Sequence, residues 1–181
     1  MIWLNEPSKW NADGDSLSLT TDPKTDFWRK THYGFIRDNG HFFYQTVSGD
    51  FVVETEFQGS YHALYDQAGL MIRSDETTWL KTGIEFVDSV QYISAVVTRD
   101  YSDWSVVKLS VPIRSLRLRA TQKGGSIIIE YDTGTDVWTM LRTTFLSSAP
   151  VLQVGPMAAS PDGPGFEVHF HKFTITPTSS P

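Results

Sequence analysis

The sequence predicts a single all-β domain built as a two-sheet antiparallel β-sandwich. Short segments in which apolar and polar residues alternate recur along the chain, separated by glycine, asparagine, aspartate and serine, a pattern typical of sandwiches and barrels. No window carries the apolar spacing of an amphipathic helix. The length of 181 residues fits one domain, which we place at residues 1–177, followed by a disordered tail at 178–181.

The alternation also predicts where the strands lie. Tight turns favour glycine, so Gly124-Gly125 is expected to close a hairpin. The apolar alternation of the last strand breaks at His171-Lys172, where we expect a β-bulge. One helical turn at most is expected, within 60–66 or 74–78. The predicted strands are 41–44, 51–57, 67–73, 81–86, 91–99, 105–110, 115–121, 126–131, 137–142, 152–157 and 166–175.

Composition and charge exclude several classes of function. The chain has no cysteine, so thiol catalysis, disulfides and thiolate metal sites are ruled out. A net charge of −6 argues against nucleic acid, whose affinity depends on basic residues, and against an anionic membrane surface. No basic and apolar leader is visible at the N-terminus, and no apolar run reaches membrane-spanning length. We therefore expect a cytoplasmic protein without a cofactor. Its oligomeric state is left open.

The densest group of chemically useful residues lies between Tyr65 and Trp104. On the predicted strands, every second side chain points away from the core, which would gather cations, a carboxylate, an amide and hydroxyls on one sheet face. Gly69 and Gly83 would let a ligand approach the backbone, and two tryptophans would stand at the rim. A solvated ion network would look similar. The predicted ligand-binding residues are Gln67, Met71, Arg73, Trp79, Lys81, Glu85, Ser94, Thr98 and Trp104.

Glu85 is the candidate catalytic residue if the protein is an enzyme. Lys81 and Arg73 on the neighbouring positions would hold its carboxylate ionised, so it could act as a base or nucleophile. Two other pairs, Glu54 with Glu56 and Glu130 with Asp132, have the spacing of paired carboxylates on one strand face. Both are more typical of an exposed strand.

Histidines offer a weaker signal. Glu167, His169 and His171 share one face of the last predicted strand, and a His-x-His pair can chelate zinc when a third ligand is present. An exposed outer face explains the same spacing, so no metal site is predicted. His32 and His41 lie in the aromatic segment 27–44, where a packed histidine is the favoured interpretation over a ligand contact.

Several of these segments resemble the DUF1349 family, which includes a yeast regulation of enolase protein and bacterial YesU-type proteins. The resemblance is carried by 65–73, 79–85 and 98–105, together with 26–35 and 40–43, and it covers about residues 3 to 177. The family is similar to the concanavalin A-like lectins and glucanases. That similarity implies a jelly roll with a concave face, but it implies no activity.

Three functions remain open from the sequence. The favoured one is a carbohydrate-binding domain whose ligand, a carbohydrate or sugar acid, lies on the concave sheet face. The second is an enzyme that processes a glycan or sugar acid with Glu85, although the glucanase-like strand motif Glu-x-Asp-x-(x)-Glu is missing after both Asp132 and Glu56. The third is a regulatory domain that binds another protein.

Overall fold

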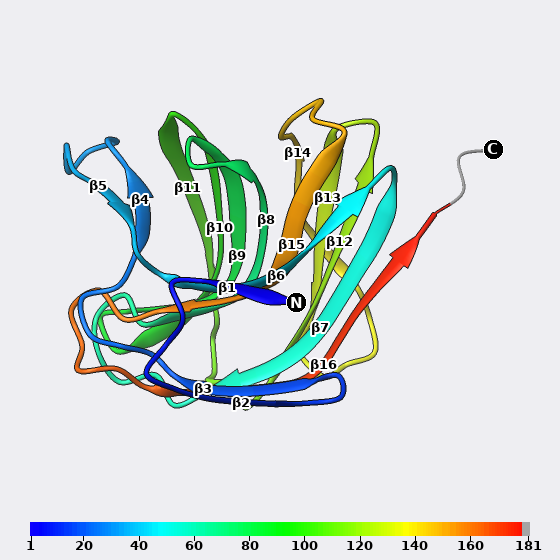
Figure 1. Ribbon diagram of the computed structural model, residues 1–181. Coiled ribbons are helices and arrows are strands. Elements are labelled where there is room, and N and C mark those ends of the chain that lie inside the picture. The colour runs from blue at the N-terminus through cyan, green and yellow to red at the C-terminus, as the bar shows by residue number, and fades with distance from the viewer. Residues whose placement is uncertain (179–181) are drawn as a thin grey trace.

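Two antiparallel sheets stack face to face, and a short hairpin stands apart from both (Figure 1). The computed structural model describes residues 1–178, and these contain no helix. The segment 60–66 is a loop that contains a turn, and 74–78 consists of the two-residue turn at 76–77 with the strand residues on either side of it. Within the described residues there is accordingly no helix long and apolar enough to cross a membrane. The predicted all-β sandwich is confirmed.

Sheet A carries the residues predicted to bind a ligand. Its seven strands all pair antiparallel with their neighbours. In spatial order they are β1 (Ile2–Leu4), β6 (His41–Ser48), β15 (Val151–Ala159), β8 (Gln67–Asp75), β9 (Thr78–Val87), β10 (Val90–Arg99) and β11 (Tyr101–Lys108).

Sheet B forms the second layer and also has seven antiparallel strands. Its β16 changes register between Phe170 and Lys172, so the predicted bulge is confirmed. The spatial order is β14 (Thr139–Phe145), β13 (Ser126–Asp132), β12 (Leu116–Lys123), β7 (Phe51–Gly59), β16 (Glu167–Pro177), β3 (Ser16–Thr20) and β2 (Lys9–Asp13).

The main core lies between the two sheets and follows the predicted alternation. On β8 and β9, Leu70, Ile72 and Leu80 face sheet B and are fully buried. The odd-numbered residues of β8 and β9 point away from sheet B, because successive side chains of a strand point to opposite faces. We call this opposite surface the outer face of sheet A. The sequence predicted correctly which side chains it carries.

The N-terminal strands β1 to β5 escaped prediction. Three of them, β1, β4 and β5, have only three residues each, and every residue of β2 is exposed, so they carry little alternation. The predicted tail needs one adjustment, because β16 continues through Pro177 and the Thr178 amide donates to the Asp50 carbonyl over 2.9 Å. The remainder of that tail, 179–181, lies outside the described residues.

The hairpin of β4 (Phe27–Arg29) and β5 (Ile36–Asp38) covers part of the outer face of sheet A. Figure 1 shows it on the side of β8 to β11 that faces away from sheet B. Phe27 and Trp28 pack there in a second hydrophobic cluster with Phe42, Met71 and Trp79. Gly40 allows this packing, because a Cβ at that position would collide with the Phe27 ring.

Ion pairs fix the hairpin to the sheet. Arg73 on β8 makes two hydrogen bonds to the Asp38 carboxylate, of 2.6 and 2.8 Å. At the other end, Arg29 and Lys30 both bind the Asp100 carboxylate, and the Arg29 amide donates to Ser102. Since the Arg73 side chain is only 7% exposed, its charge depends on Asp38 for compensation.

Gly69 and Gly83 have a different role from the predicted one. They lie opposite each other on β8 and β9. A Cβ on either residue would run into the backbone of the other strand. These glycines therefore allow the two strands to approach closely, and the expectation that they admit a ligand is corrected.

Replacing Asp38 should loosen the hairpin. We expect Asp38→Asn to lower the free energy of unfolding by about 2 kcal/mol, because it leaves the buried Arg73 guanidinium without its counter-charge. Urea denaturation measures this change. Asp100→Asn is the matched control at the exposed ion pair and should cost less. An equal loss in both variants would contradict the argument.

Candidate functional site

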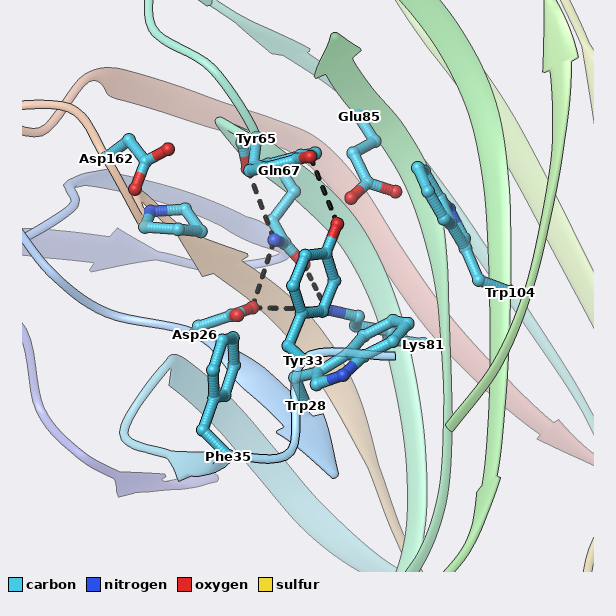
Figure 2. A pocket seen from close by; sticks show the side chains of 11 residues that line it. Asp26, Trp28, Tyr33, Phe35, Tyr65, Gln67, Lys81, Glu85, Trp104 and Asp162 are labelled. Carbon is cyan, nitrogen blue, oxygen red and sulfur yellow. Dashed lines mark hydrogen bonds and ion pairs between the residues drawn. The ribbon is translucent and has the colours of Figure 1, made fainter. Parts of the chain in front are cut away.

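A pocket of about 210 Å³ opens between the β4–β5 hairpin and the outer face of sheet A. Figure 2 shows the side chains that surround it. They come from the hairpin segment, from strands β8, β9 and β11, and from the two loops that precede β8 and β16. The lining residues are Asp26, Trp28, Tyr33, Phe35, Tyr65, Gln67, Lys81, Glu85, Trp104, Pro161 and Asp162.

Lys81 organises the floor of the pocket. Its ammonium donates to the Phe27 carbonyl over 2.7 Å, to Gln67 Oε1 over 2.6 Å and to Asp26 Oδ1 over 3.4 Å. Gln67 in turn donates to Asp26 Oδ1 and to the Tyr65 carbonyl. One buried cation thus ties the hairpin, the sheet and the loop before β8 together.

Glu85 sits beside this network and is only 7% exposed. Ser94 donates a 2.7 Å hydrogen bond to its Oε2, and the Trp104 indole N–H donates to the Ser94 hydroxyl. Burial raises the pKa of Glu85, although Lys81 and the Ser94 hydrogen bond act in the opposite direction. The net shift of the Glu85 pKa is therefore upward, opposite to the direction expected from cationic neighbours: Arg73 is occupied by Asp38, and desolvation outweighs Lys81.

Two tyrosines meet at the mouth of the pocket. The hydroxyls of Tyr33, at the hairpin tip, and Tyr65, before β8, lie 3.2 Å apart. This hydrogen bond, followed by burial, raises the pKa of Tyr65 to about 12. Tyr65 has a φ of 65°, a left-handed conformation that costs energy for a bulky side chain. Such strain is often found where a side chain is held for function.

The structure brings together part of the predicted ligand-binding set. Four of its members line the pocket, namely Gln67, Lys81, Glu85 and Trp104. Ser94 does not line it but donates a hydrogen bond to Glu85. The remaining four residues, Met71, Arg73, Trp79 and Thr98, lie on the same sheet face but do not line it.

The position of Trp79 differs most from the prediction. It was expected at the rim, but it is fully buried with its ring 6.2 Å from that of Phe27. The hairpin covers it, so it has no exposed surface on which a ring could stack. Trp104, the other predicted rim tryptophan, is 37% exposed.

The sequence did not identify the residues that the hairpin and loops contribute. Asp26, Trp28, Tyr33 and Phe35 come from the hairpin segment, and Asp162 comes from the loop before β16. The sequence pointed to this segment only through the high aromatic content of 27–44, which does not indicate where the segment lies in the fold. A fold-back of this hairpin over the sheet depends on contacts distant in sequence, and strand periodicity does not encode them.

The other candidate clusters lie on sheet B. Arg119 binds both Glu54 and Glu130 there, while the buried Asp132 accepts hydrogen bonds from its own turn. His169 bonds to Ser18 over 2.8 Å. No group of three or more His, Cys, Asp or Glu within 1–178 is placed to hold a metal ion.

The two remaining histidines are placed differently from each other. His41 is buried, with Nδ1 bonded to the Asn5 carbonyl and Nε2 accepting from the Asp22 amide, and burial lowers its pKa. His32 lies at the hairpin tip, where its ring contacts that of Tyr33 at a centroid distance of 4.8 Å. Neither of them lines the pocket.

Residues 3–178 match a family described as "Protein of unknown function (DUF1349)". The chain belongs to this family. It is 39% identical over 174 residues to "Regulation of enolase protein 1" of Saccharomyces cerevisiae, a match that covers 96% of this chain and 88% of that protein. It is also 32% identical over 97 residues, half of the chain, to "Uncharacterized protein AN7484" of Emericella nidulans.

Solved structures share the fold. A functionally unknown protein from Saccharomyces cerevisiae superposes with a TM-score of 0.94 at 38% identity, covering 99% of this chain and 97% of that one. A legume lectin-like domain from Entamoeba histolytica gives 0.64 at 10% identity, covering 96% and 89%. The GH43 BlXynB protein from Bacillus licheniformis gives 0.68 at 16%, but this chain spans only 33% of it. The concanavalin A-like lectin and glucanase fold is thereby confirmed.

The raised pKa of Glu85 predicts a pH-dependent cost to the fold. The folded protein binds the Glu85 proton more tightly than the unfolded chain, so the stability contribution of Glu85 is present below the unfolded pKa and is lost as pH rises through the folded value. Glu85→Gln keeps an acceptor for Ser94 and removes the charge. We expect the variant to gain stability over the wild type at pH 8 but not at pH 4, as measured by urea denaturation.

The control for this prediction is Glu76→Gln, since Glu76 is exposed. It should shift stability by less than about 0.5 kcal/mol at either pH. A Glu85→Gln variant that is less stable than the wild type at pH 8 would show that ionised Glu85 supports the fold.

Proposed function

We propose that the pocket binds a carbohydrate, with one sugar ring held between its aromatic walls. The observation that carries the proposal is the composition of the lining: Trp28, Tyr33, Phe35, Tyr65 and Trp104 surround a floor of amide, ammonium and carboxylate groups. Aromatic rings match the apolar face of a sugar, while a few fixed polar groups match its hydroxyls.

The geometry of the walls supports this ligand class. Trp28 and Trp104 stand at right angles with ring centroids 6.4 Å apart, and Tyr33 stacks on Phe35 at 5.4 Å. The indole N–H groups of both tryptophans are already bonded, to Thr31 and Ser94. Trp104 therefore offers apolar ring surface to a ligand rather than a hydrogen bond, and Trp28, which is 8% exposed, adds a smaller apolar area.

Removing one wall should weaken sugar binding. Trp104→Ala is expected to reduce affinity about tenfold, because an aromatic contact contributes about 0.5–1.5 kcal/mol beyond its buried area. Isothermal titration with monosaccharides and short neutral oligosaccharides measures the loss. Trp10→Ala is a matched control, since Trp10 is 39% exposed against 37% for Trp104 and lies outside the pocket. No binding of any sugar to the wild type would contradict the proposal.

Catalysis is the second candidate function, because Glu85 combines a raised pKa with a place in the pocket. A desolvated carboxyl of this kind can act as a general acid, and Asp26 and Asp162 offer a further carboxylate. Product release from a glycan that Glu85→Gln abolishes, with binding retained, would support an enzyme. Binding with no turnover by the wild type would leave a binding domain.

A further inference from the structure

The pocket contains one cation, and that cation has no capacity left for a ligand. A lysine ammonium has three donors, and Lys81 directs them to three acceptors, one each from Phe27, Gln67 and Asp26. At 4% exposure, Lys81 also has almost no surface. Three cations near the hairpin, Arg29, Lys30 and Arg73, are paired with Asp100 and Asp38. A fourth, Arg37 on β5, lies over the Phe35 ring at 4.8 Å from its centroid, and none of the four lines the pocket.

Most of the neutral donors are also engaged. The Gln67 amide donates to Asp26 and to the Tyr65 carbonyl, and the two indole N–H groups have their own acceptors. Between Tyr33 and Tyr65, one hydroxyl hydrogen is used in their mutual bond, so one remains. Among the lining residues of 1–178, this leaves a single side-chain hydrogen available to a ligand.

Acceptors, in contrast, are in excess. Glu85 accepts a hydrogen bond from Ser94 at Oε2, and the Trp104 side chain acts as a further donor to its carboxyl group. The hydrogen bonds of the described chain engage Asp26 only at Oδ1. Glu85 is more than nine-tenths buried, and Figure 2 shows its carboxyl group between Tyr65 and Trp104. Asp162 adds an exposed carboxylate at the rim. Three carboxyl groups with acceptor capacity to spare therefore border a space in which the one cation among the described lining residues, Lys81, is already bonded.

The walls favour positive charge as well. Five aromatic residues line the pocket, and the faces of such rings carry negative potential that attracts cations. An enclosure of aromatic rings with nearby carboxylates is the arrangement that recognises organic ammonium groups. The same surroundings repel an anion, which would have to face Glu85, Asp26 and Asp162 with no free cation among the described lining residues.

We propose that this pocket selects an organic ammonium group, carried by an amino sugar or by a quaternary ammonium compound, and rejects sugar acids. If the ligand is an amino sugar, this inference rests on the proposed carbohydrate function and makes it more specific. If the ligand is another ammonium compound, the inference holds for the same pocket and the carbohydrate proposal does not. It also narrows the ligand class first considered, a carbohydrate or sugar acid, by removing the acids.

Four small probes of graded charge test the proposal by isothermal titration against the wild-type protein at one pH. Glucose and glucosamine differ by an amino group, glucuronate carries a carboxylate, and tetramethylammonium carries the charge without a sugar. We expect glucosamine to bind at least tenfold more tightly than glucose, tetramethylammonium to bind measurably, and glucuronate to show no binding.

The outcomes separate this inference from the proposed function. Equal binding of glucose and glucosamine would overturn charge selection and leave carbohydrate binding intact. Binding of tetramethylammonium with no binding of any sugar would identify a non-sugar ammonium compound and overturn the carbohydrate proposal. Tight binding of glucuronate would overturn the inference, and no binding of any probe would count against both.

Substitutions of the pocket carboxyl groups test which residues cause the preference for glucosamine over glucose. Asp162→Asn and Glu85→Gln should each weaken glucosamine binding about three- to tenfold while changing glucose binding less. Glu76→Gln, outside the pocket, is the matched control and should leave both affinities unchanged. Asp162 is exposed, so its replacement tests the charge without disturbing the core. An unchanged ratio of glucosamine to glucose affinity in both pocket variants would contradict the assignment.

Discussion

The candidate site depends on the packing of one short hairpin against the outer face of sheet A. Phe27, on β4, is fully buried there against Trp79, and full burial of a side chain of this size contributes about 1.5–3 kcal/mol. Without the hairpin, the cluster of Met71, Trp79 and Val96 would be an exposed apolar patch on the sheet. The hairpin thus completes a second core and, at its edge, leaves a pocket between the two surfaces.

Lys81 joins this packing to the chemistry of the pocket. A buried ammonium is tolerated only when its donors are satisfied, and two of its three acceptors, the Phe27 carbonyl and Asp26, belong to the hairpin segment. The position of the hairpin and the charge balance of the floor are therefore set by the same bonds. A change that displaced the hairpin would at once expose the cation and open one wall of the pocket.

The sequence predicted the scaffold well because strand periodicity records which side chains face the core. It placed Gln67, Lys81, Glu85 and Ser94 on one sheet face correctly. It misplaced Trp79, because alternation distinguishes two faces but does not reveal whether a further segment covers one of them. The contribution of Tyr33 and Asp26 depended on a hairpin with three-residue strands, which leave almost no periodic signal.

Glu85 illustrates why the electrostatics of the site required the structure. Its sequence neighbours suggested stabilisation by cations, but a pKa depends on burial and on where those cations direct their bonds. Arg73 binds Asp38, and Lys81 is shared among three acceptors. Desolvation is therefore the largest influence on the pKa of Glu85. A carboxyl group kept in such surroundings costs stability when it is ionised. A ligand that donates a hydrogen bond or brings a positive charge would relieve that cost on binding, so the fold's penalty would contribute to affinity for that ligand.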